Sequence, residues 1–355
     1  METPARDSQA FHNRHEAHTL KAYQDENLLP DRYVFVITNM CNLRCSFCFQ
    51  KKEELPNAMT TQQWIDLVDQ LPDYARVTFT GGEPFAFKGF KDVYSHVAKR
   101  KLDCNIITNG TLLNEPLIDF LLTNERLRVL SISIDSVGNT VRDVKKRQWA
   151  RAEDMIRLFS KKKKEFNHDC VLEAKTVILD AHAEEILNIH KYCLEDLKVD
   201  HHTYQFLKGS PIQHADYMFE FDAIFKEYKA PTYKKFEVIQ EQLKKVQEYN
   251  LKNNTFGFLH PKIATLTENT EFGDLSYINH TGLDSNRFKP CMFPWSSVHI
   301  NTDGSLFPCM AVEMGNVKET PLKEIITGPK FKKFKEVLRK GLVGGCNRCG
   351  WLRPN

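Results

Sequence analysis

Between residues 33 and 207, short apolar runs rich in β-branched residues alternate with segments whose apolar residues recur at helical spacing. The apolar runs predict six strands: Tyr33–Thr38, Arg76–Thr80, Cys104–Thr108, Arg128–Ile134, Val171–Leu179 and His202–Leu207. The segments between the strands predict helices. In the first of these segments, Thr60 or Thr61 caps a helix in which Trp64, Leu67, Val68 and Leu71 share one face. Further helices are predicted at Glu115–Leu122 and Ile186–Leu194.

This alternation of strands and helices predicts an α/β fold with a parallel sheet. Six strands joined by right-handed helical crossovers make a partial (β/α)6 TIM-like barrel, which leaves a lateral gap that an eight-stranded barrel would close. Functional groups of such a barrel lie at the carboxyl ends of its strands. The barrel is expected to span residues 31–207.

The flanking regions follow other patterns. Residues 1–30 are polar and are expected to form a mobile or loosely docked leader. His12, His15 and His18 recur there at every third position, as in a metal site on one side of a helix, although a solvated run is the more common case. Residues 208–290 are expected to form a helical and loop-rich insertion, with helices at Tyr217–Tyr228 and along the face Phe236, Ile239, Leu243 and Val246.

Residues 291–355 predict a small C-terminal module that contains a β-hairpin and a helix. Val298–Thr302 and Ser305–Pro308 alternate like strands around Asp303-Gly304, a strong hairpin signal. The helical pattern that follows is broken at Gly328-Pro329.

Composition narrows the class of protein. At 355 residues and 41% hydrophobic content, the chain is long enough for one core and an appended module. With 49 Lys and Arg against 46 Asp and Glu, the formal charge of +3 indicates neither a nucleic acid nor a membrane as partner. No window reaches the roughly 18–20 apolar residues of a membrane span, so we expect a cytoplasmic protein. Its ten cysteines then indicate metal ligation rather than disulfides.

Two sets of cysteines carry candidate iron–sulfur chemistry. Cys41, Cys45 and Cys48 follow the first predicted strand closely, and three thiolates can hold only three irons of a [4Fe–4S] cluster, which leaves the fourth iron open. The second set, in the C-terminal module, consists of Cys291, Cys309, Cys346 and Cys349. Four thiolates complete the ligation of a [4Fe–4S] cluster. By spacing alone, a structural zinc ion suits the second set equally well.

The first cysteine set resembles that of the radical S-adenosylmethionine (SAM) enzymes, together with Phe47 and the segment Gly81-Gly82-Glu83-Pro84. The resemblance implies that SAM chelates the open iron and is cleaved to a 5'-deoxyadenosyl radical. The second set, with Gly304 before Cys309, resembles the twitch module, a shortened SPASM domain with one auxiliary [4Fe–4S] cluster. This resemblance favours a cluster over zinc.

The resemblance also implies contacts with SAM. Glu83 corresponds to a position that meets the methionyl amine, with a capped turn as the alternative. Ser133 and Asp135 end the fourth strand, where ribose contacts are common, although Asp135 could instead cap a helix. Asn109 faces the SAM site in this family. Two further contacts are Lys175, which would pair with the SAM carboxylate or with a buried acid, and Gln205, which would meet the substrate or the adenine.

For the reaction, the module order resembles twitch-bearing alcohol dehydrogenases of aminoglycoside biosynthesis. We therefore expect net oxidation of a carbohydrate- or aminocyclitol-like alcohol, with the auxiliary cluster as electron acceptor and a flavodoxin or ferredoxin as electron donor. No catalytic base can be assigned. A second hypothesis is an epimerase that uses a cysteine hydrogen donor, for which Cys104, Cys170 and Cys193 are candidates.

Peptide modification and a non-catalytic role stay open as hypotheses. Oxidation or crosslinking of a ribosomally made peptide is common among SPASM and twitch enzymes, but the leader is too short to fold alone as a peptide-binding domain. A role as a non-catalytic metal or electron-transfer protein would not explain the Gly81-Gly82-Glu83 segment.

Overall fold

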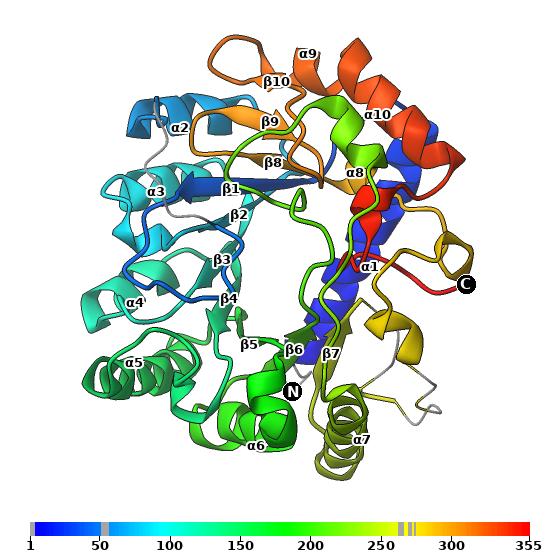
Figure 1. The fold of residues 1–355 in the computed structure, drawn as a ribbon. Helices are drawn as coiled ribbons and strands as arrows, with labels where there is room; N and C mark the ends of the chain where they lie inside the picture. Colours follow the sequence, from blue (N-terminus) through cyan, green and yellow to red (C-terminus); the bar gives the residue numbers. More distant parts are fainter. Residues whose placement is uncertain (1–3, 51–56, 262–265, 269–271, 273–274) are drawn as a thin grey trace.

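A computed structural model describes residues 4–50, 57–261, 266–268, 272 and 275–355 of the chain. The described residues form one curved sheet of ten strands in the order β10-β9-β8-β1-β2-β3-β4-β5-β6-β7 (Figure 1). The strands are β1 (Arg32–Thr38), β2 (Arg76–Gly81), β3 (Asp103–Thr108), β4 (Leu127–Ser133), β5 (Val171–Val177), β6 (His201–Gln205), β7 (Gly257–His260), β8 (Ser297–Ile300), β9 (Ser305–Phe307) and β10 (Gly315–Asn316). Neighbouring strands from β8 through β1 to β7 are parallel, whereas β8, β9 and β10 are antiparallel.

Helices α2 to α7 lie outside the curved sheet (Figure 1). The α-helices are α1 (Pro4–Gln24), α2 (Thr61–Asp69), α3 (Phe90–Lys99), α4 (Glu115–Leu122), α5 (Lys146–Glu165), α6 (Ile186–Lys191), α7 (Phe236–Asn253), α8 (Phe293–Ser296), α9 (Leu322–Ile326) and α10 (Pro329–Lys340). The start of α2 shows why the predicted helices form. Thr60 and Gln63 make a capping box, and Trp64 is buried against the sheet. The predicted partial barrel with helical crossovers is confirmed.

The sheet extends beyond the six predicted strands. Residues 208–290 do not form only an insertion, because α7 leads into β7, which pairs with β6 through Tyr204 and Leu259. On the other side, β8 of the C-terminal region pairs in parallel with β1 through Phe35 and Ile300. The four residues of β7 are too short to show a clear period of two, so this strand was not predicted. Strand β8 was predicted only as one arm of the C-terminal hairpin, and its pairing with β1 was not predicted.

The helix predicted at Tyr217–Tyr228 is wrong. Only Phe221–Phe225 turns there, as a short 3₁₀ helix. Phe219 instead forms an isolated bridge with Val312, and its backbone N–H donates to the Ala311 carbonyl at 2.7 Å. Hydrogen bonds to another segment replace the helical ones, so aromatic spacing alone was misleading.

The expectation of a loosely docked leader is also wrong for the described residues. Helix α1 packs against α8, where the Tyr23 ring meets Trp295 edge-on at 4.7 Å. Arg339 donates to the Tyr23 carbonyl at 2.6 Å. His15 bonds to Asp31 at 2.6 Å, and His18 bonds to the Leu29 carbonyl at 2.9 Å. These partners lie outside the helix, so its polar composition did not reveal them.

The two imidazoles of α1 that the structure describes, His15 and His18, are therefore engaged in hydrogen bonds within the protein. The third predicted member, His12, has its side chain outside the described residues. The predicted C-terminal hairpin is confirmed: β8 and β9 pair around Gly304, whose φ of +90° suits glycine. The predicted break at Gly328-Pro329 separates α9 from α10.

Candidate functional site

The first cysteine set lies in the loop that follows β1. In the described part of the chain, Cys41, Cys45 and Cys48 form no disulfide, and all three are partly exposed. The Cys41 Sγ accepts a hydrogen bond from the Leu43 backbone N–H at 3.4 Å, and the Cys48 N–H donates to the Cys45 carbonyl at 3.2 Å. The first bond places a donor at the Cys41 sulfur, and the second closes a tight turn between Cys45 and Cys48.

All three thiols open into a single cavity of about 1520 Å³ inside the curved sheet. Its wall is made by alternate residues of the parallel strands, such as Val34 and Val36 of β1, because side chains of a strand point alternately to its two faces. The same cavity extends to Cys291 and Cys349 of the second set. It is therefore a candidate active site that is bordered by both sets of cysteines.

The glycines after β2 allow the backbone to approach the cysteine loop closely. A Cβ on Gly81 would lie 2.1 Å from the Thr38 carbonyl oxygen, and Gly81 has a φ of +131°. A Cβ on Gly82 would lie 2.2 Å from the Met40 carbonyl oxygen. Both glycines line the cavity. Side chains at these positions would push the end of β2 away from the cysteines.

Glu83 and Pro84 lie behind this wall, because neither of them lines the cavity. The Glu83 carboxylate is fully buried and accepts hydrogen bonds from Thr108 Oγ1 at 2.7 Å and from the Asn109 backbone N–H at 2.8 Å. It also caps the 3₁₀ turn at Pro84–Ala86. Burial raises its pKa to about 7 despite these bonds. Its place matches the alternative of a capped turn.

Asp135 also lies outside the cavity lining. Its buried carboxylate accepts from the Val177 backbone N–H at 2.6 Å and pairs with Arg142. This place does not support the predicted ribose contact, because the carboxylate already has partners within the fold. Ser133 at the end of β4 does line the cavity.

Arg142, which the sequence did not single out, is the cation that Asp135 holds. Its guanidinium lies 5.5 Å from the centre of the Phe47 ring and 4.0 Å from the Cys45 Sγ, and it lines the cavity. Arg142 follows a short 3₁₀ turn in a segment without periodicity. Only the acidic residue at the end of β4 could have hinted at a cation nearby.

Asn109, Lys175 and Gln205 line the cavity as well. The Asn109 side chain donates to the Cys41 Sγ at 3.8 Å. The Lys175 Nζ lies 3.2 Å from the carboxylate of Glu173, so the structure shows the predicted pairing with a buried acid. Although burial alone would raise the pKa of Glu173, Lys175 and His201 hold it well below the usual range.

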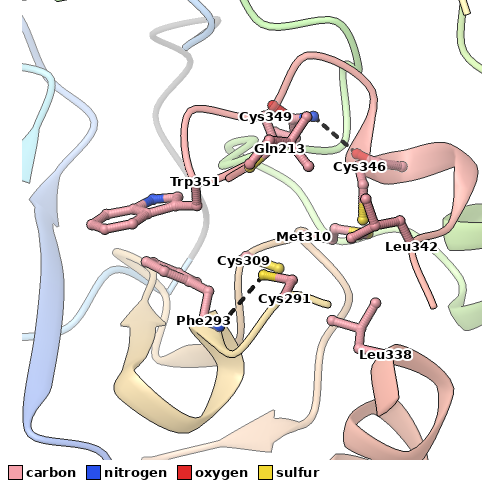
Figure 2. A pocket seen from close by; sticks show the side chains of 12 residues that line it. Gln213, Cys291, Phe293, Cys309, Met310, Leu338, Leu342, Cys346, Cys349 and Trp351 are labelled. Atoms are coloured by element: carbon pink, nitrogen blue, oxygen red, sulfur yellow. Dashed lines mark hydrogen bonds between the residues drawn. The ribbon is translucent and has the colours of Figure 1, made fainter. Parts of the chain in front are cut away.

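The second set gathers around a small pocket of about 10 Å³ (Figure 2). The four thiols are Cys291 before α8, Cys309 after β9, and Cys346 and Cys349 after α10. The Phe293 backbone N–H donates to the Cys291 Sγ at 3.4 Å. Burial and the three neighbouring thiols raise the pKa of Cys309 well above its usual range, which shows that the four groups influence one another.

Gln213 anchors this second set and was not recognised in the sequence. Its Nε2 donates to the carbonyls of Gly345 at 2.9 Å and Asn347 at 2.8 Å, on either side of Cys346. Gln213 follows β6 and is more than 130 residues away in the chain. Its partners are backbone carbonyls, which have no sequence signature.

The cysteines proposed as hydrogen donors do not reach the cavity. Cys104, Cys170 and Cys193 are fully buried in the core, and none lines the cavity. Burial raises the pKa of the Cys170 thiol to about 12 and shifts the other two in the same direction. The three cysteines thus pack as small apolar residues of the core. Their burial contradicts the predicted role as hydrogen donors of an epimerase.

The two sets suit iron–sulfur clusters by the chemistry of their donors. Seven cysteines that form no disulfide in the described chain are grouped as three and four, and each group borders a pocket. Within the described residues, no group of three or more Cys, His, Asp or Glu is placed to hold a single metal ion. The parallel barrel and these two thiol groups define the class of the molecule as an iron–sulfur protein with a barrel-borne site.

Comparisons with known proteins make the assignment specific. Residues 35–174 match the family model of the radical SAM superfamily, and residues 291–350 match that of the SPASM iron–sulfur cluster-binding domain. Residues 35–174 thus form a radical SAM domain, and residues 291–350 form a SPASM domain. These domains imply a [4Fe–4S] cluster, an auxiliary cluster and SAM as cofactors, which favours a cluster over zinc at the second set.

One relative is the sporulation killing factor maturation protein SkfB of Bacillus subtilis, 30% identical over 171 residues, which are 47% of this chain and 40% of SkfB. Another is the PqqA peptide cyclase of Granulibacter bethesdensis, 22% identical over 316 residues, 84% of this chain and 74% of the cyclase. The chain thus aligns with less than half the length of SkfB.

Among solved structures, Streptococcus suis SuiB bound to its precursor peptide SuiA has the same fold, with a TM-score of 0.62 and 17% identity. The match covers 94% of this chain and 74% of SuiB. In the described part of the chain, no helix combines the length and the apolar character of a membrane span.

Proposed function

We propose that this radical SAM enzyme cleaves SAM at a cluster held by Cys41, Cys45 and Cys48 and uses the resulting radical to oxidise or crosslink a peptide. The observation that carries the proposal is the single cavity bordered by both sets of cysteines. When bound, the first cluster would supply one electron to SAM and so generate the 5'-deoxyadenosyl radical. The remaining roles belong to the residues of the chain.

The cavity wall supports specific contacts with SAM. Gly81 and Gly82 would let the backbone meet the methionyl end beside the cysteine loop, since any side chain there would clash. Arg142 and Ser133 are a cation and a hydroxyl suited to the SAM carboxylate. Asp135 would act as a positioning residue, because it holds the Arg142 guanidinium.

Three predicted contacts keep narrower roles in this proposal. Asn109 would orient the cysteine loop through Cys41. Glu83 would fix the turn after β2 rather than meet the SAM amine through its side chain. Gln205 lies beside Gly350, where an added Cβ would be 3.5 Å from its Nε2, so Gln205 would contact substrate next to the second cysteine set.

The second set would serve electron transfer. A cluster ligated by Cys291, Cys309, Cys346 and Cys349 has no free iron for substrate, which favours a role as electron acceptor in a net oxidation. Lys208 lies on the path between the sets: it lines the cavity, and its Nζ is 3.8 Å from the centre of the Phe49 ring. Burial lowers its pKa to about 7. A flavodoxin or ferredoxin would supply the first electron.

For the substrate, a peptide is better supported than the carbohydrate-like alcohol expected from the resemblance. SkfB is named as a maturation protein of a killing factor, and the relative from Granulibacter bethesdensis is named as a peptide cyclase. A cavity of about 1520 Å³ exceeds the roughly 300–1,000 Å³ of a small-molecule site, which leaves room for a peptide segment beside SAM.

Mass spectrometry of the product tests the substrate class. The reconstituted protein would be incubated anaerobically with SAM, dithionite and a precursor peptide encoded next to its gene. We expect a peptide that is two hydrogens lighter, and no such product from Cys309→Ala. An unchanged peptide, together with oxidation of a sugar alcohol under the same conditions, would contradict the peptide assignment. Solvent deuterium at an inverted carbon would indicate epimerisation instead.

A further inference from the structure

The cavity concentrates positive charge. Ten Lys and Arg side chains line it against four Asp and Glu, whereas the whole chain carries a formal charge of only +3. A cavity wall with an excess of one charge attracts ligands of the opposite charge. The low dielectric constant of the surrounding protein strengthens this attraction. Some of these cations lie near the cysteines and would balance the negative charge of the thiolates. Cations that lie away from sulfur are therefore the better indication of an anionic ligand.

Four of these ten cations have a carboxylate partner within 4 Å. Lys175 pairs with Glu173 at 3.2 Å, Arg128 with Asp103 at 2.9 Å and Arg353 with Glu16 at 2.8 Å. Arg142 pairs with Asp135. These pairs stabilise the wall of the barrel and do not require a ligand.

Arg32 differs from them. It is the first residue of β1 and lines the cavity, yet the described residues place no carboxylate within 4 Å of it. Its Nε donates to Thr78 Oγ1 at 3.3 Å, and its guanidinium lies 5.7 Å from the centre of the Trp351 ring. These contacts include no cysteine sulfur. A guanidinium enclosed in this way offers donors to an anion.

Asp31 and Glu173, the two acids whose charge acts on Arg32, are engaged elsewhere. Asp31 bonds to His15 at 2.6 Å. Glu173 accepts from Thr203 Oγ1 at 2.7 Å and pairs with Lys175. Neither acid therefore neutralises Arg32 through a direct hydrogen bond. Enclosure of Arg32 lowers its pKa to about 9, which still leaves it charged at neutral pH.

A second orphan group lies on the same wall. The Oδ1 of Asn105 is buried without a hydrogen-bond partner in the described part of the chain, and Asn105 lines the cavity in register with Thr78. A buried acceptor of this kind requires a donor, which a peptide N–H provides. Trp351 adds an apolar surface suited to the methylenes of an acidic side chain.

We propose that Arg32 forms a carboxylate-binding site in the cavity, which recognises an acidic side chain of the peptide substrate, while the Asn105 Oδ1 on the same wall accepts from a backbone N–H of that peptide. The inference rests on the proposed function, because it assigns the substrate class of the same cavity. Arg32 and the cysteine loop lie at opposite ends of β1, about 20 Å apart for a strand of this length. The acidic residue would thus anchor the peptide away from the reacting position.

Calorimetric titration of the full chain with both clusters tests this site. The probes are N-acetylated, C-amidated tetraglutamate and tetraglutamine, which differ only in the side-chain carboxylates. We expect the wild type to bind tetraglutamate at least about tenfold more tightly than tetraglutamine. This comparison needs no variant, so it stays valid if a substitution impairs folding. Equal affinity for the two peptides would overturn the proposal.

Three variants locate the interaction. Arg32→Gln should remove the preference for tetraglutamate, and Arg32→Lys should keep part of it because the charge remains. Arg157→Gln is the matched control, since Arg157 is exposed on α5 and does not line the cavity. Unchanged tetraglutamate binding by Arg32→Gln would overturn the proposal.

Two further readouts separate this proposal from others. Tetraglutamine with a free C-terminus tests whether a terminal carboxylate is the ligand; if it alone binds tightly, the side-chain assignment is wrong. SAM cleavage without peptide is measured on the same samples. Its absence would contradict the proposed function, whereas normal SAM cleavage with equal peptide affinities would contradict only the carboxylate site.

Discussion

At the residue scale, two carboxylates that sequence reasoning placed on SAM accept hydrogen bonds within the fold. Glu83 and Asp135 both follow a strand that ends at the cavity, and both turn their oxygens toward backbone N–H groups within the protein. A carboxylate at the end of a strand can accept hydrogen bonds from a ligand or from the backbone of a loop. The residue type alone does not distinguish these two roles. Asp135 does not line the cavity, but Arg142, with which it forms an ion pair, does.

The raised pKa of Glu83 predicts a pH dependence of stability. Burial raises this pKa from 4.5 to about 7, so the folded protein holds a proton that the unfolded chain releases. The free energy of unfolding should therefore fall by about 3 kcal/mol as pH rises from 4.5 to 7. Denaturant titrations of the wild type and of Glu83→Gln at several pH values isolate the effect. Parallel pH profiles of the two proteins would contradict it.

Gly82 tests the close approach of β2 to the cysteine loop. Gly82→Ala should destabilise the protein by about 1–3 kcal/mol and lower its iron content, because the new Cβ meets the Met40 carbonyl oxygen. Gly282→Ala is the control, since a Cβ there has no neighbour within 4 Å. Iron analysis and thermal unfolding measure both effects, and equal behaviour of the two variants would refute the steric argument.

At the scale of elements, six strands of the barrel could be predicted because their β-branched runs are long enough to show a pattern. The hairpin at Gly304 was predictable from its turn residues. Strand β7 could not be predicted, and neither could the pairing of β8 with β1 or the docking of α1 through Tyr23, because these depend on partners distant in the chain. Long-range pairing, rather than local preference, decides these elements.

Gln213 links the segment after β6 to the second cysteine set. Gln213→Ala removes both hydrogen bonds to the Cys346–Cys349 turn and should cost about 1–3 kcal/mol. The reconstituted variant should lose about half of the iron that two clusters supply. Gln62→Ala on the exposed face of α2 is the control. Full iron content in Gln213→Ala would show that the turn does not need this anchor.

At the scale of the whole molecule, the C-terminal region completes the wall of the barrel. Strand β8 extends the sheet beside β1, and Cys291 and Cys349 border the same cavity as Cys41. The sequence predicted both cysteine sets from their spacing, but it could not show that they share one cavity. That arrangement depends on the parallel pairing of β8 with β1 and on Gln213, which the pattern of residues did not reveal.

The most direct test of the central claim is the formation of 5'-deoxyadenosine from SAM by the reduced, reconstituted protein. The wild type should form it, Cys45→Ala should form none, and Cys170→Ala should match the wild type because Cys170 lies in the core. The account would be contradicted if the wild type, loaded with about eight irons, formed no 5'-deoxyadenosine, or if Cys45→Ala formed it as fast as the wild type.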